Sequence, residues 1–472
     1  MIPVYSFKGK TVAIFGLARS GISAARSLMA GGASVVSWDD KPAAREAAQR
    51  AGIAVHDLND VDWHGIAALV LSPGVPLTHP KPHPFVIKAQ NARTEIIGDV
   101  ELFFRAVRPE GDQIQPKIVC ITGTNGKSTT TALIGHLLSR LGFDAEVGGN
   151  IGTAILDLAP PTPRRAYVIE MSSYQIDLTP SVKPDVAVLI NITPDHLDRH
   201  GTMENYAAVK ANIFRHQGRG DHAVIGVDDA FSSEICTRLS SRSGIAVTPV
   251  SVGKVLGRGI FVLDGKLYDA TGTTSREVRD LKTLTHMPGA HNWQNAAIAY
   301  AAVRPLVKDP SEIAGVISSF PGLEHRIELV GQVGNVRFVN DSKATNADAA
   351  ARALACYEDG IYWIAGGKAK EGGIESLAPF FPRMKHAYLI GDAMDSFATT
   401  LSGKVTVTKA GTLEAAMRAA AKDAAGGPSE PVVLLSPACA SFDQFRDYEH
   451  RGNEFKRVFA LIADEARLRG AA

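Results

Sequence analysis

The segment from Lys117 to Thr131 constrains this chain more than any other part of its sequence. Its apolar start, Ile118 to Ile121, predicts a buried strand, and the apolar residues after Lys127 are spaced as in a helix. The glycine-containing turn between them predicts a phosphate-binding loop, because backbone N–H groups and the helix dipole at such a turn both favour negative charge. We therefore expect ATP or GTP here, with Lys127 on the phosphates and Ser128 within reach of Mg²⁺.

The turn is shorter than the standard phosphate loop, because Gly123 lies only three residues before Gly126. A plain glycine-rich turn is the alternative, but Gly-Lys-Ser-Thr directly after a strand favours a nucleotide site. The residues expected to bind ATP here are Gly123, Thr124, Asn125, Gly126, Lys127, Ser128 and Thr129.

Length and composition set the class of protein. A chain of 472 residues predicts about three domains, and 45% hydrophobic residues allow each its own core. The net charge of +1 gives no reason to expect a nucleic-acid partner. Four scattered cysteines, no signal peptide and no apolar run of about 18 residues predict a cytoplasmic protein that does not insert into a membrane.

The N-terminal region has the pattern of a strand, a turn and a helix. Thr11 to Phe15 predicts a strand, Gly16 to Gly21 a turn into a helix, and Ser34 to Trp38 a second strand. Three interpretations remain open: an NAD site with Asp39 on a ribose, a purely structural turn, or a site for the diphosphate of another nucleotide. A third strand, Ala67 to Leu71, ends at Ser72-Pro-Gly-Val75.

The rest of the chain alternates strands and helices, which predicts parallel sheets covered on both faces. Hairpins are expected in the glycine-rich stretch 253–274, and an alanine-rich helix over 415–425. Further strands are expected at Ala166 to Glu170, Asp185 to Asn191, Arg337 to Asn340, Ile361 to Ala365, Ala387 to Ile390 and Val432 to Leu435.

Three residues of the central region have side chains suited to chemistry. Glu170 lies where a strand ends, beside the phosphate loop, and can hold Mg²⁺ or remain an ordinary solvated acid. His196 follows another strand among acidic residues and is a candidate ligand. Lys210 lies within an apolar helical stripe, so it either reaches past the stripe to water or reaches a metal-phosphate site, as a cation or as a carbamate that binds Mg²⁺.

Further polar groups occur in the last third of the chain. Asn292 and Asn295 lie three residues apart, and their amides suit an adenine edge, although Asn292 could instead cap the helix. The other polar loops, three of which directly follow expected strands, begin at Leu323, Asn340, Gly366 and Ser436.

Taken in order from Gly16 to Phe455, these motifs resemble the Mur ligase family of peptidoglycan synthesis, and within it the members that add D-glutamate. The motifs are Gly-Thr-Asn-Gly-Lys-Ser-Thr, Glu-Met-Ser-Ser, Asn-x-x-x-Asp-His-Leu-Asp, His-Asn-x-x-Asn, Glu-His-Arg, Asn-Asp-Ser-Lys-Ala-Thr-Asn and Ser-Pro-Ala-Cys-Ala-Ser-Phe-Asp-Gln-Phe. The resemblance implies an α/β fold of three domains. These are a Rossmann-like UDP-substrate domain (1–98), a central phosphate-loop ATPase domain with a mostly parallel sheet (99–322), and a Rossmann-like C-terminal domain for the amino acid and ATP (323–472).

The resemblance also implies the reaction and its substrates. ATP would phosphorylate the carboxylate of UDP-N-acetylmuramoyl-L-alanine, and D-glutamate would displace phosphate from the acyl phosphate. All three are small molecules, so we expect a cytoplasmic enzyme that acts as a monomer without a nucleic-acid or membrane partner. The nearest alternative is a related ligase, such as an L-alanine-adding or folylpolyglutamate enzyme; an NAD-dependent dehydrogenase and a nucleotide-binding regulator without turnover are alternatives from other classes.

The family's functional residues transfer to matching positions of this chain. The catalytic set implied is Lys127, Glu170, His196 and Lys210. One Mg²⁺ would bind Ser128 and Glu170, and a second would bind His196 and carbamylated Lys210. Beyond the loop, ATP would contact Asn292, Asn295, Arg326, Asp341 and Lys343. The UDP-substrate would contact Arg19, Ser20, Asp39, Asp40, Lys41, Ser72, Pro73, Gly74, Asn150 and His196. D-Glutamate would contact Thr345, Lys370, Ser441 and Tyr448.

Two positions depart from the family pattern. Tyr448 stands where phenylalanine is expected, and Gly-Gly-Lys-Ala-Lys leaves both Lys368 and Lys370 as candidates for the cation that binds D-glutamate.

Overall fold

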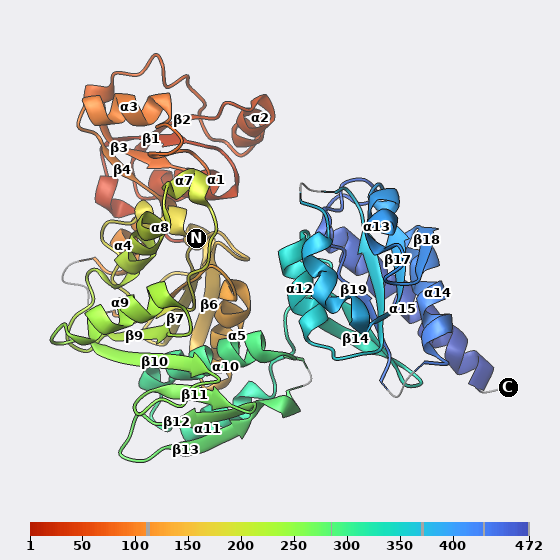
Figure 1. The fold of residues 1–472 in the computed structure, drawn as a ribbon. Helices are drawn as coiled ribbons and strands as arrows, with labels where there is room; N and C mark the ends of the chain where they lie inside the picture. The colour runs from red at the N-terminus through yellow and green to blue at the C-terminus, as the bar shows by residue number, and fades with distance from the viewer. Residues whose placement is uncertain (110–113, 285, 370–371, 428–429, 471–472) are drawn as a thin grey trace. The chain divides into compact units, whose positions relative to one another are not determined.

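The computed structural model describes residues 1–109, 114–284, 286–369, 372–427 and 430–470 (Figure 1). The chain divides into two compact units. The first comprises Met1–Leu281 with Trp293–Phe320, and the second comprises Lys282–Asn292 with Pro321–Ala472. In the described part of the chain, no helix combines the length and the apolar character needed to cross a membrane.

The first unit begins with a four-stranded parallel sheet of order β2-β1-β3-β4. Its strands are β1 (Thr11–Phe15), β2 (Ser34–Trp38), β3 (Ile66–Leu71) and β4 (Glu95–Ile97). The helices of this region are η1 (Tyr5–Phe7), α1 (Arg19–Ala30), α2 (Pro42–Arg50), η2 (Trp63–Gly65), α3 (Pro84–Asn91) and α4 (Asp99–Val107).

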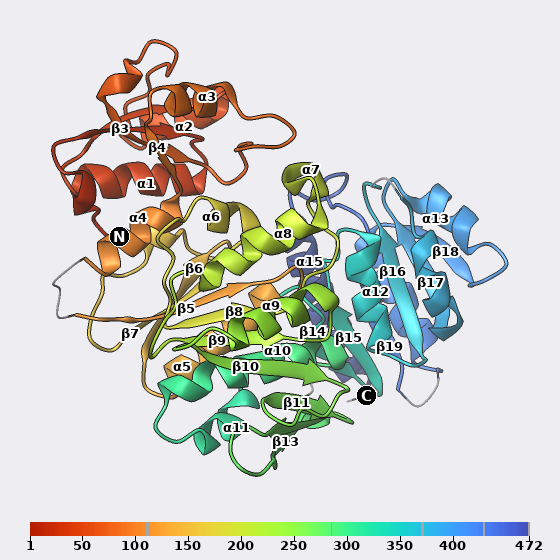
Figure 2. The same ribbon diagram turned by 60° about the vertical axis from the view of Figure 1, so that its left-hand side comes forward.

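A nine-stranded sheet of order β13-β12-β11-β10-β9-β8-β5-β7-β6 follows in the same unit. Its strands are β5 (Lys117–Thr122), β6 (Asp144–Gly149), β7 (Arg165–Glu170), β8 (Val186–Leu189), β9 (His222–Gly226), β10 (Ala246–Val252), β11 (Ile260–Leu263), β12 (Lys266–Asp269) and β13 (Arg276–Asp280). The helices are α5 (Lys127–Arg140), η3 (Ile155–Asp157), α6 (Ser173–Asp177), α7 (Leu197–His200), α8 (Met203–Ala211), η4 (Asn212–Phe214), α9 (Ala230–Ser240), η5 (Leu281–Thr283), α10 (Ala290–Val303), η6 (Arg304–Leu306) and α11 (Ser311–Ile317). α5 packs on β5, β6 and β7, whereas α9 packs on β9 and β10 (Figure 2).

This sheet is parallel from β6 to β11 and antiparallel at β12 and β13. The change of direction comes from a two-residue turn, Asp264-Gly265, whose φ angles are 50° and 77°. An Asp-Gly pair with positive φ at both residues is a preferred hairpin turn, and it is too short for a parallel crossover. The hairpin expected within 253–274 is thus confirmed as β11–β12.

The second unit contains a six-stranded sheet of order β14-β15-β19-β16-β17-β18, in which only the β14–β15 pair is antiparallel. Its strands are β14 (Glu328–Val333), β15 (Val336–Asn340), β16 (Ile361–Gly366), β17 (Met384–Ile390), β18 (Val407–Gly411) and β19 (Val432–Leu435). Its helices are α12 (Ala347–Ala355), η7 (Glu375–Arg383), α13 (Met394–Leu401), α14 (Leu413–Ala424) and α15 (Tyr448–Gly470).

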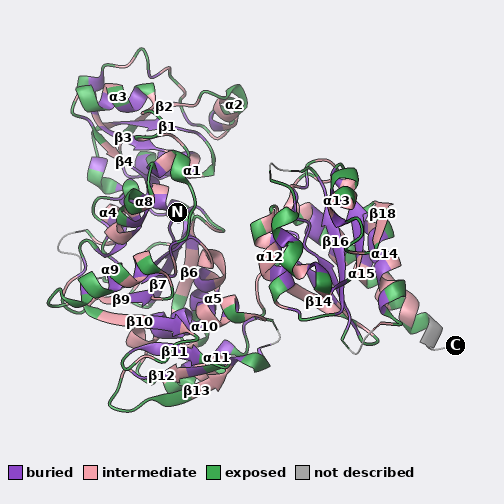
Figure 3. Ribbon diagram, viewed as in Figure 1, coloured by how far each residue is buried: buried purple, intermediate pink, exposed green. Residues whose placement is uncertain are grey.

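Each of these sheets buries both faces, as continuous apolar strands predict. In β1, Val12 and Ile14 belong to one hydrophobic cluster while Ala13 and Phe15 belong to another on the opposite face. In β16, Trp363 and Ile364 divide in the same way between two clusters. Figure 3 shows the buried strands between their helices. The mostly parallel α/β class is therefore confirmed.

Candidate active site

The phosphate loop joins β5 to α5 and depends on a glycine at its end. Gly126 has a φ of 82°, and a Cβ on it would lie 2.3 Å from Oδ1 of Asn295. Asn295 is buried and accepts a hydrogen bond from Thr130 Oγ1 at 3.1 Å, so its side chain cannot easily move away. Only glycine fits this turn without strain.

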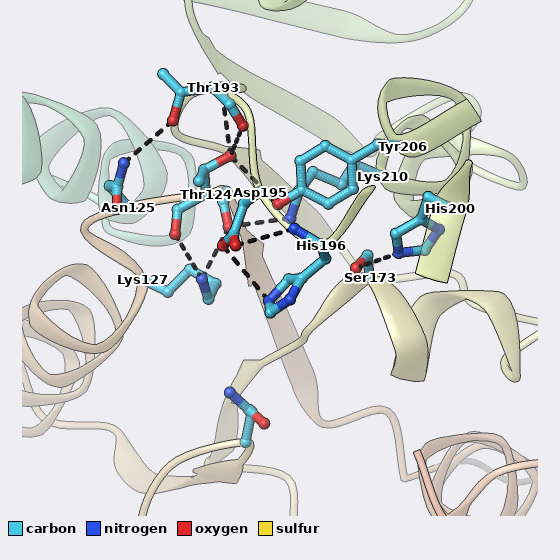
Figure 4. Close-up of polar contacts among 12 residues, drawn as sticks. Thr124, Asn125, Lys127, Ser173, Thr193, Asp195, His196, His200, Tyr206 and Lys210 are labelled. Atoms are coloured by element: carbon cyan, nitrogen blue, oxygen red, sulfur yellow. Dashed lines mark hydrogen bonds and ion pairs between the residues drawn. The ribbon is translucent and has the colours of Figure 1, made fainter. Parts of the chain in front are cut away.

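The loop is bound to the segment that follows β8 (Figure 4). The N–H of Thr124 donates to Asn191 O, and the N–H of Asn125 donates to Asn191 Oδ1, both at 2.9 Å. Thr124 Oγ1 donates to Thr193 O at 3.1 Å and accepts from the N–H of Thr193 at 3.0 Å. The phosphate loop and the loop carrying His196 are therefore held as one body.

Two lysines converge on the carbonyl of Gly123. The ammonium of Lys127 donates to the carbonyls of Gly123 and Thr124, both at 2.9 Å. Lys210 Nζ donates to Gly123 O at 3.0 Å and to Thr122 Oγ1 at 3.4 Å. Lys127, which is expected to bind phosphate, and Lys210 therefore both lie against the backbone of this loop.

Lys210 is 1% exposed, so the interpretation that it reaches past the apolar stripe to water is wrong. Burial, and next the positive charge of Lys127, hold the pKa of Lys210 well below its usual value, and Asp195 only partly opposes this. Its Nζ also lies 4.6 Å from the ring centroid of Tyr206. Burial therefore favours the neutral amine, which is the form of lysine that reacts with CO₂.

Glu170 ends β7 and is 2% exposed. Its Oε1 accepts a hydrogen bond from Asn150 Nδ2 at 3.0 Å. Its Oε2 is buried and has no hydrogen-bond partner among the described residues. A buried oxygen of this kind is costly unless something binds it, and carboxylate oxygens are the ligands that Mg²⁺ prefers. Glu170 therefore fits a metal ligand better than a solvated acid.

His196 is the N-cap residue of α7 and has a left-handed conformation with a φ of 53°. Its N–H donates to Asp195 Oδ1 at 2.9 Å, and its Nε2 lies 3.4 Å from Asp195 Oδ2. The His196 ring lies 5.1 Å from the ring of Tyr174. A strained backbone, an aspartate and an aromatic ring together fix the orientation of His196.

His200 supports this region, although no sequence pattern indicated it. The ring is buried, it is hydrogen-bonded to Ser173 Oγ at 2.9 Å, and it stacks on Tyr174 at 5.5 Å. Burial, the largest influence, lowers the pKa of His200 to about 4. His200 is therefore neutral at physiological pH and ties α7 to α6. Its position four residues after His196 was the one signal available.

Arg199 links this centre to the first sheet and was also missed. Its guanidinium donates to Gly74 O and to Val75 O, both at 2.9 Å, and lies 4.5 Å from the Tyr174 ring centroid. The loop after β3 and the His196 loop are consequently joined by one side chain.

For the reaction that the family resemblance implies, we expect Arg199→Ala to raise KM for the UDP-linked substrate and to lower kcat, each about tenfold. The variant loses two charge-assisted hydrogen bonds of about 1.5–3 kcal/mol each and frees both loops. Arg199→Lys should be intermediate, because lysine keeps the charge but not the fork of donors. Steady-state kinetics would check this against Arg258→Ala, which removes an exposed arginine. Unchanged constants in Arg199→Ala would contradict the role.

The UDP-substrate candidates of the first sheet lie in loops that contact one another. Asp39 accepts from the N–H of Leu17 at 2.7 Å and from the N–H of Lys41 at 2.8 Å. Ser72 Oγ donates to Gly16 O at 3.0 Å. Because both Asp39 oxygens bond to backbone amides, Asp39 organises the turn between β1 and α1. Asp40, Pro73 and Gly74 belong to these loops, whereas Arg19 and Ser20 begin α1.

In the second unit, Asp341 follows β15 and is buried. Its Oδ2 accepts from Ser436 Oγ at 2.8 Å, and its Oδ1 accepts from the N–H of Ile327 at 3.2 Å. Burial, the largest influence, raises the pKa of Asp341 to about 7 from 3.8. Arg326, an exposed residue, follows His325 in the adjoining loop.

This shift predicts a pH-dependent contribution of Asp341 to stability. Between pH 4 and pH 7 the folded state holds a proton that the unfolded state has released. The contribution is therefore full below about pH 4 and is lost as the pH rises through about 7. A pKa that moves from 3.8 to about 7 corresponds to about 4 kcal/mol. Asp341→Asn should flatten the fall in Tm between pH 5 and 7.5, as measured by calorimetry at matched ionic strength; parallel curves would contradict it.

The D-glutamate candidates lie in loops held together by Arg451, which the sequence reasoning missed. Arg451 is fully buried, and its Nε donates to Ser342 Oγ at 3.0 Å. One terminal nitrogen donates to both Ser342 O at 2.9 Å and Cys439 O at 3.1 Å. It thereby joins the loop that carries Lys343 and Thr345 to the loop that carries Ser441. The partners are backbone carbonyls of distant segments, so no local motif marks Arg451.

The remaining candidates have these positions. Lys343 Nζ lies 3.7 Å from the ring centroid of Tyr448, whose hydroxyl donates to Glu449. Asn292 lies inside α10 and donates to Pro288 O at 2.8 Å, so the helix-capping interpretation is wrong. Lys370 lies outside the described residues, whereas the backbone of Lys368 pairs with Ala440.

No group of three or more His, Cys, Asp or Glu side chains close enough to bind a metal occurs within the described ranges. Each expected Mg²⁺ set contains only one residue of these types, Glu170 beside Ser128 in one and His196 beside Lys210 in the other.

These features define the class of protein: an α/β protein with mostly parallel sheets and a loop between a strand and a helix that ends in glycine. Residues 121–303 match the Mur ligase middle domain, and residues 325–439 match the Mur ligase glutamate ligase domain. The chain belongs to the Mur ligase family.

The chain is similar over at least 98% of its length to two ligases. It is 55% identical over 464 residues to UDP-N-acetylmuramoylalanine--D-glutamate ligase of Phenylobacterium zucineum, covering 98% of this chain and 99% of the relative. It is 51% identical over 475 residues to the ligase of the same name from Brucella abortus (strain 2308), covering 100% of both. Among solved structures, UDP-N-acetylmuramate-alanine ligase of Thermotoga maritima aligns with a TM-score of 0.56 at 16% identity, covering 96% of this chain and 99% of that chain, which shows a shared fold.

Proposed function

We propose that this chain joins D-glutamate to UDP-N-acetylmuramoyl-L-alanine, with hydrolysis of ATP to ADP and phosphate, in the synthesis of peptidoglycan precursors. The observation that carries the proposal is the full-length similarity, at 51–55% identity, to relatives named for this reaction. The position of the Lys127 ammonium on the phosphate loop supports it independently, because phosphoryl transfer needs positive charge there.

The reaction requires activation, because a free carboxylate does not condense with an amine at neutral pH. The γ-phosphoryl group of ATP is transferred to the L-alanine carboxylate, which gives an acyl phosphate and ADP. The amine of D-glutamate then attacks the acyl carbon, the amide bond forms, and phosphate leaves. Lys127 neutralises charge on the transferring group, while the loops fixed by Thr124 and Asn191 position the reactants.

Two Mg²⁺ sites are part of the proposal. Ser128 and Glu170 would hold one ion, which suits the buried, unpartnered Oε2 of Glu170. His196 and carbamylated Lys210 would hold the other. Bound Mg²⁺ supplies charge neutralisation on the phosphate oxygens. Carbamylation joins the neutral Lys210 amine to CO₂ with release of a proton, and it converts a buried amine into an anionic oxygen ligand.

The substrates are assigned to three regions, with boundaries at 98/99 and 322/323. The Rossmann-like first region would bind UDP through Arg19, Ser20, residues 39–41 and residues 72–74, with Asn150 and His196 nearer the muramoyl group. ATP would bind the phosphate loop together with Asn292, Asn295, Arg326, Asp341 and Lys343. Thr345, Ser441, Tyr448 and Lys370 or Lys368 would bind D-glutamate in the Rossmann-like last region. We propose a cytoplasmic monomer.

The decisive test is phosphate release from ATP with UDP-N-acetylmuramoyl-L-alanine and a panel of D- and L-amino acids. We expect release to depend on D-glutamate and on Mg²⁺, and the product to gain the mass of one glutamate residue. Release with a different amino acid would move the protein to another specificity within the family. Absence of release with every amino acid would refute the proposed reaction.

A further inference from the structure

Two side chains of opposite hydrogen-bonding character face each other at the carboxyl end of the first sheet. Asp40 follows β2, and His83 precedes α3, far away in sequence. His83 Nε2 lies 3.5 Å from Asp40 Oδ2. Their side chains are 19% and 67% exposed, so both remain accessible to a ligand. The family resemblance gave Asp40 a place near the nucleotide, but nothing in the sequence pointed to His83.

The side chains of Asp39 and Arg45 fix the backbone around Asp40. Asp39 uses its own carboxylate on the amides of Leu17 and Lys41. A terminal nitrogen of Arg45 donates to Asp39 O at 2.7 Å and to Asp40 O at 3.0 Å, while its guanidinium lies 4.4 Å from the Trp38 ring centroid. Asp39 therefore organises the loop, whereas the carboxylate of Asp40 is directed at His83 and the surface.

The hydrogen bonds of His83 determine which nitrogen carries its proton. The Nδ1 of His83 accepts from the N–H of Phe85 at 3.3 Å and thereby caps α3. A neutral ring that accepts at Nδ1 carries its hydrogen on Nε2, the nitrogen that faces Asp40. The ring lies 4.3 Å from that of Phe15 and 5.3 Å from that of Phe85, so packing holds its plane. Nε2–H is thus a donor of defined direction.

We propose that His83 and Asp40 together read the uracil edge of the UDP-linked substrate, a role that rests on the proposed function. Uracil presents an N3–H donor beside carbonyl acceptors. The Asp40 carboxylate accepts from N3–H, and His83 Nε2–H donates to the neighbouring carbonyl. Cytosine has an acceptor at N3 and an amine beside it. Its N3 acceptor would face the acceptor Asp40, and its amine donor would face the donor His83, so neither hydrogen bond could form. His83 is then a specificity-determining residue.

A surface ion pair without a ligand is the competing explanation. Such pairs contribute little to stability, and this one has a separation near the upper limit for direct contact. The position of this pair in the fold favours a ligand-binding role over a plain surface ion pair. β1 and β3 end beside it, and the Gly16–Ser72 contact brings the turn that would carry the diphosphate to the same edge. Nucleotides bind at such edges of parallel sheets.

The test compares binding of UDP, CDP and N3-methyl-UDP to the full chain by calorimetry. Wild type should bind UDP about tenfold or more tightly than either analogue. His83→Ser keeps a helix-capping side chain but removes the ring, and it should reduce the UDP-to-CDP ratio about tenfold. Asp40→Asn, which offers an amide where a carboxylate stood, should reduce the same ratio and lessen the penalty of N3-methylation. His64→Ser, an exposed histidine of the same region, is the matched control.

The outcomes separate this inference from the proposed function. An unchanged UDP-to-CDP ratio in His83→Ser, with a wild-type circular dichroism spectrum, would overturn the role of His83. In that case D-glutamate-dependent phosphate release by wild type would still support the reaction. A fall in kcat/KM for the UDP-linked substrate that exceeds the fall in kcat would support base recognition, because His83 lies in a binding region and not at the reacting atoms.

Discussion

Replacing Lys210 by alanine is expected to lower kcat for D-glutamate-dependent phosphate release by about two orders of magnitude or more. The amine is buried, it bonds only to neutral oxygens among the described residues, and its pKa is lowered by burial and by Lys127. A carbamate at this position would supply a carboxylate-like oxygen at the mouth of the phosphate loop. Alanine removes that oxygen and leaves a space of about the size of the carbamate group. Added acetate should therefore restore part of the rate to Lys210→Ala.

Lys210→Arg provides the sharper comparison. A guanidinium keeps the positive charge but does not form a stable carbamate, so this variant should be as slow as Lys210→Ala and should not respond to acetate. Wild type in CO₂-depleted buffer should lose activity and regain it with bicarbonate. Lys183→Ala, at an exposed lysine, serves as the control. Full activity of Lys210→Arg would show that a cation, and not a carbamate, is needed.

Glu170→Gln is expected to lower activity without lowering the stability of the ligand-free protein. We expect kcat to fall about a hundredfold or more, because the amide cannot replace an anionic ligand of Mg²⁺. The ligand-free variant should nevertheless be at least as stable as wild type, since it no longer buries a carboxylate oxygen that lacks a hydrogen-bond partner. Thermal unfolding with and without Mg-ATP checks both effects. Wild type should gain more Tm from Mg-ATP than the variant does.

The control for this comparison is Glu204→Gln, which changes an exposed glutamate by the same atoms. A ligand-free Glu170→Gln protein that is clearly less stable than wild type would mean that the carboxylate has a structural role. Retention of kcat would mean that Glu170 does not bind the metal.

The parts of the fold that could be predicted from the sequence are those that local patterns determine. The apolar run 118–121 followed by Gly126 and Lys127 predicts β5, the loop and α5, because strand burial, a left-handed turn and a helix start each have their own local signal. The conflict at Lys210 was also visible, since a lysine in an apolar stripe needs a reason. Only the structure shows that Lys210 does not reach water but lies buried against the carbonyl of Gly123 and near Lys127.

Two of the residues that sequence reasoning missed act through distant backbone. Arg199 donates to carbonyls of Gly74 and Val75, and Arg451 donates to those of Ser342 and Cys439. A carbonyl is present at every position, so the partner leaves no mark in the sequence. His83 was missed for a related reason, because its partner Asp40 lies in a different loop and only the assembled sheet brings the two together.

The Arg199 bridge has a consequence for inhibition. A small molecule that bound the loop after β3 and competed for the carbonyls of Gly74 and Val75 would detach Arg199 from them. Arg199 packs on Tyr174, and the ring of Tyr174 lies beside that of His196. Such a compound would disturb the loop that carries His196 while leaving the proposed ATP site open. Its inhibition would therefore be noncompetitive with ATP.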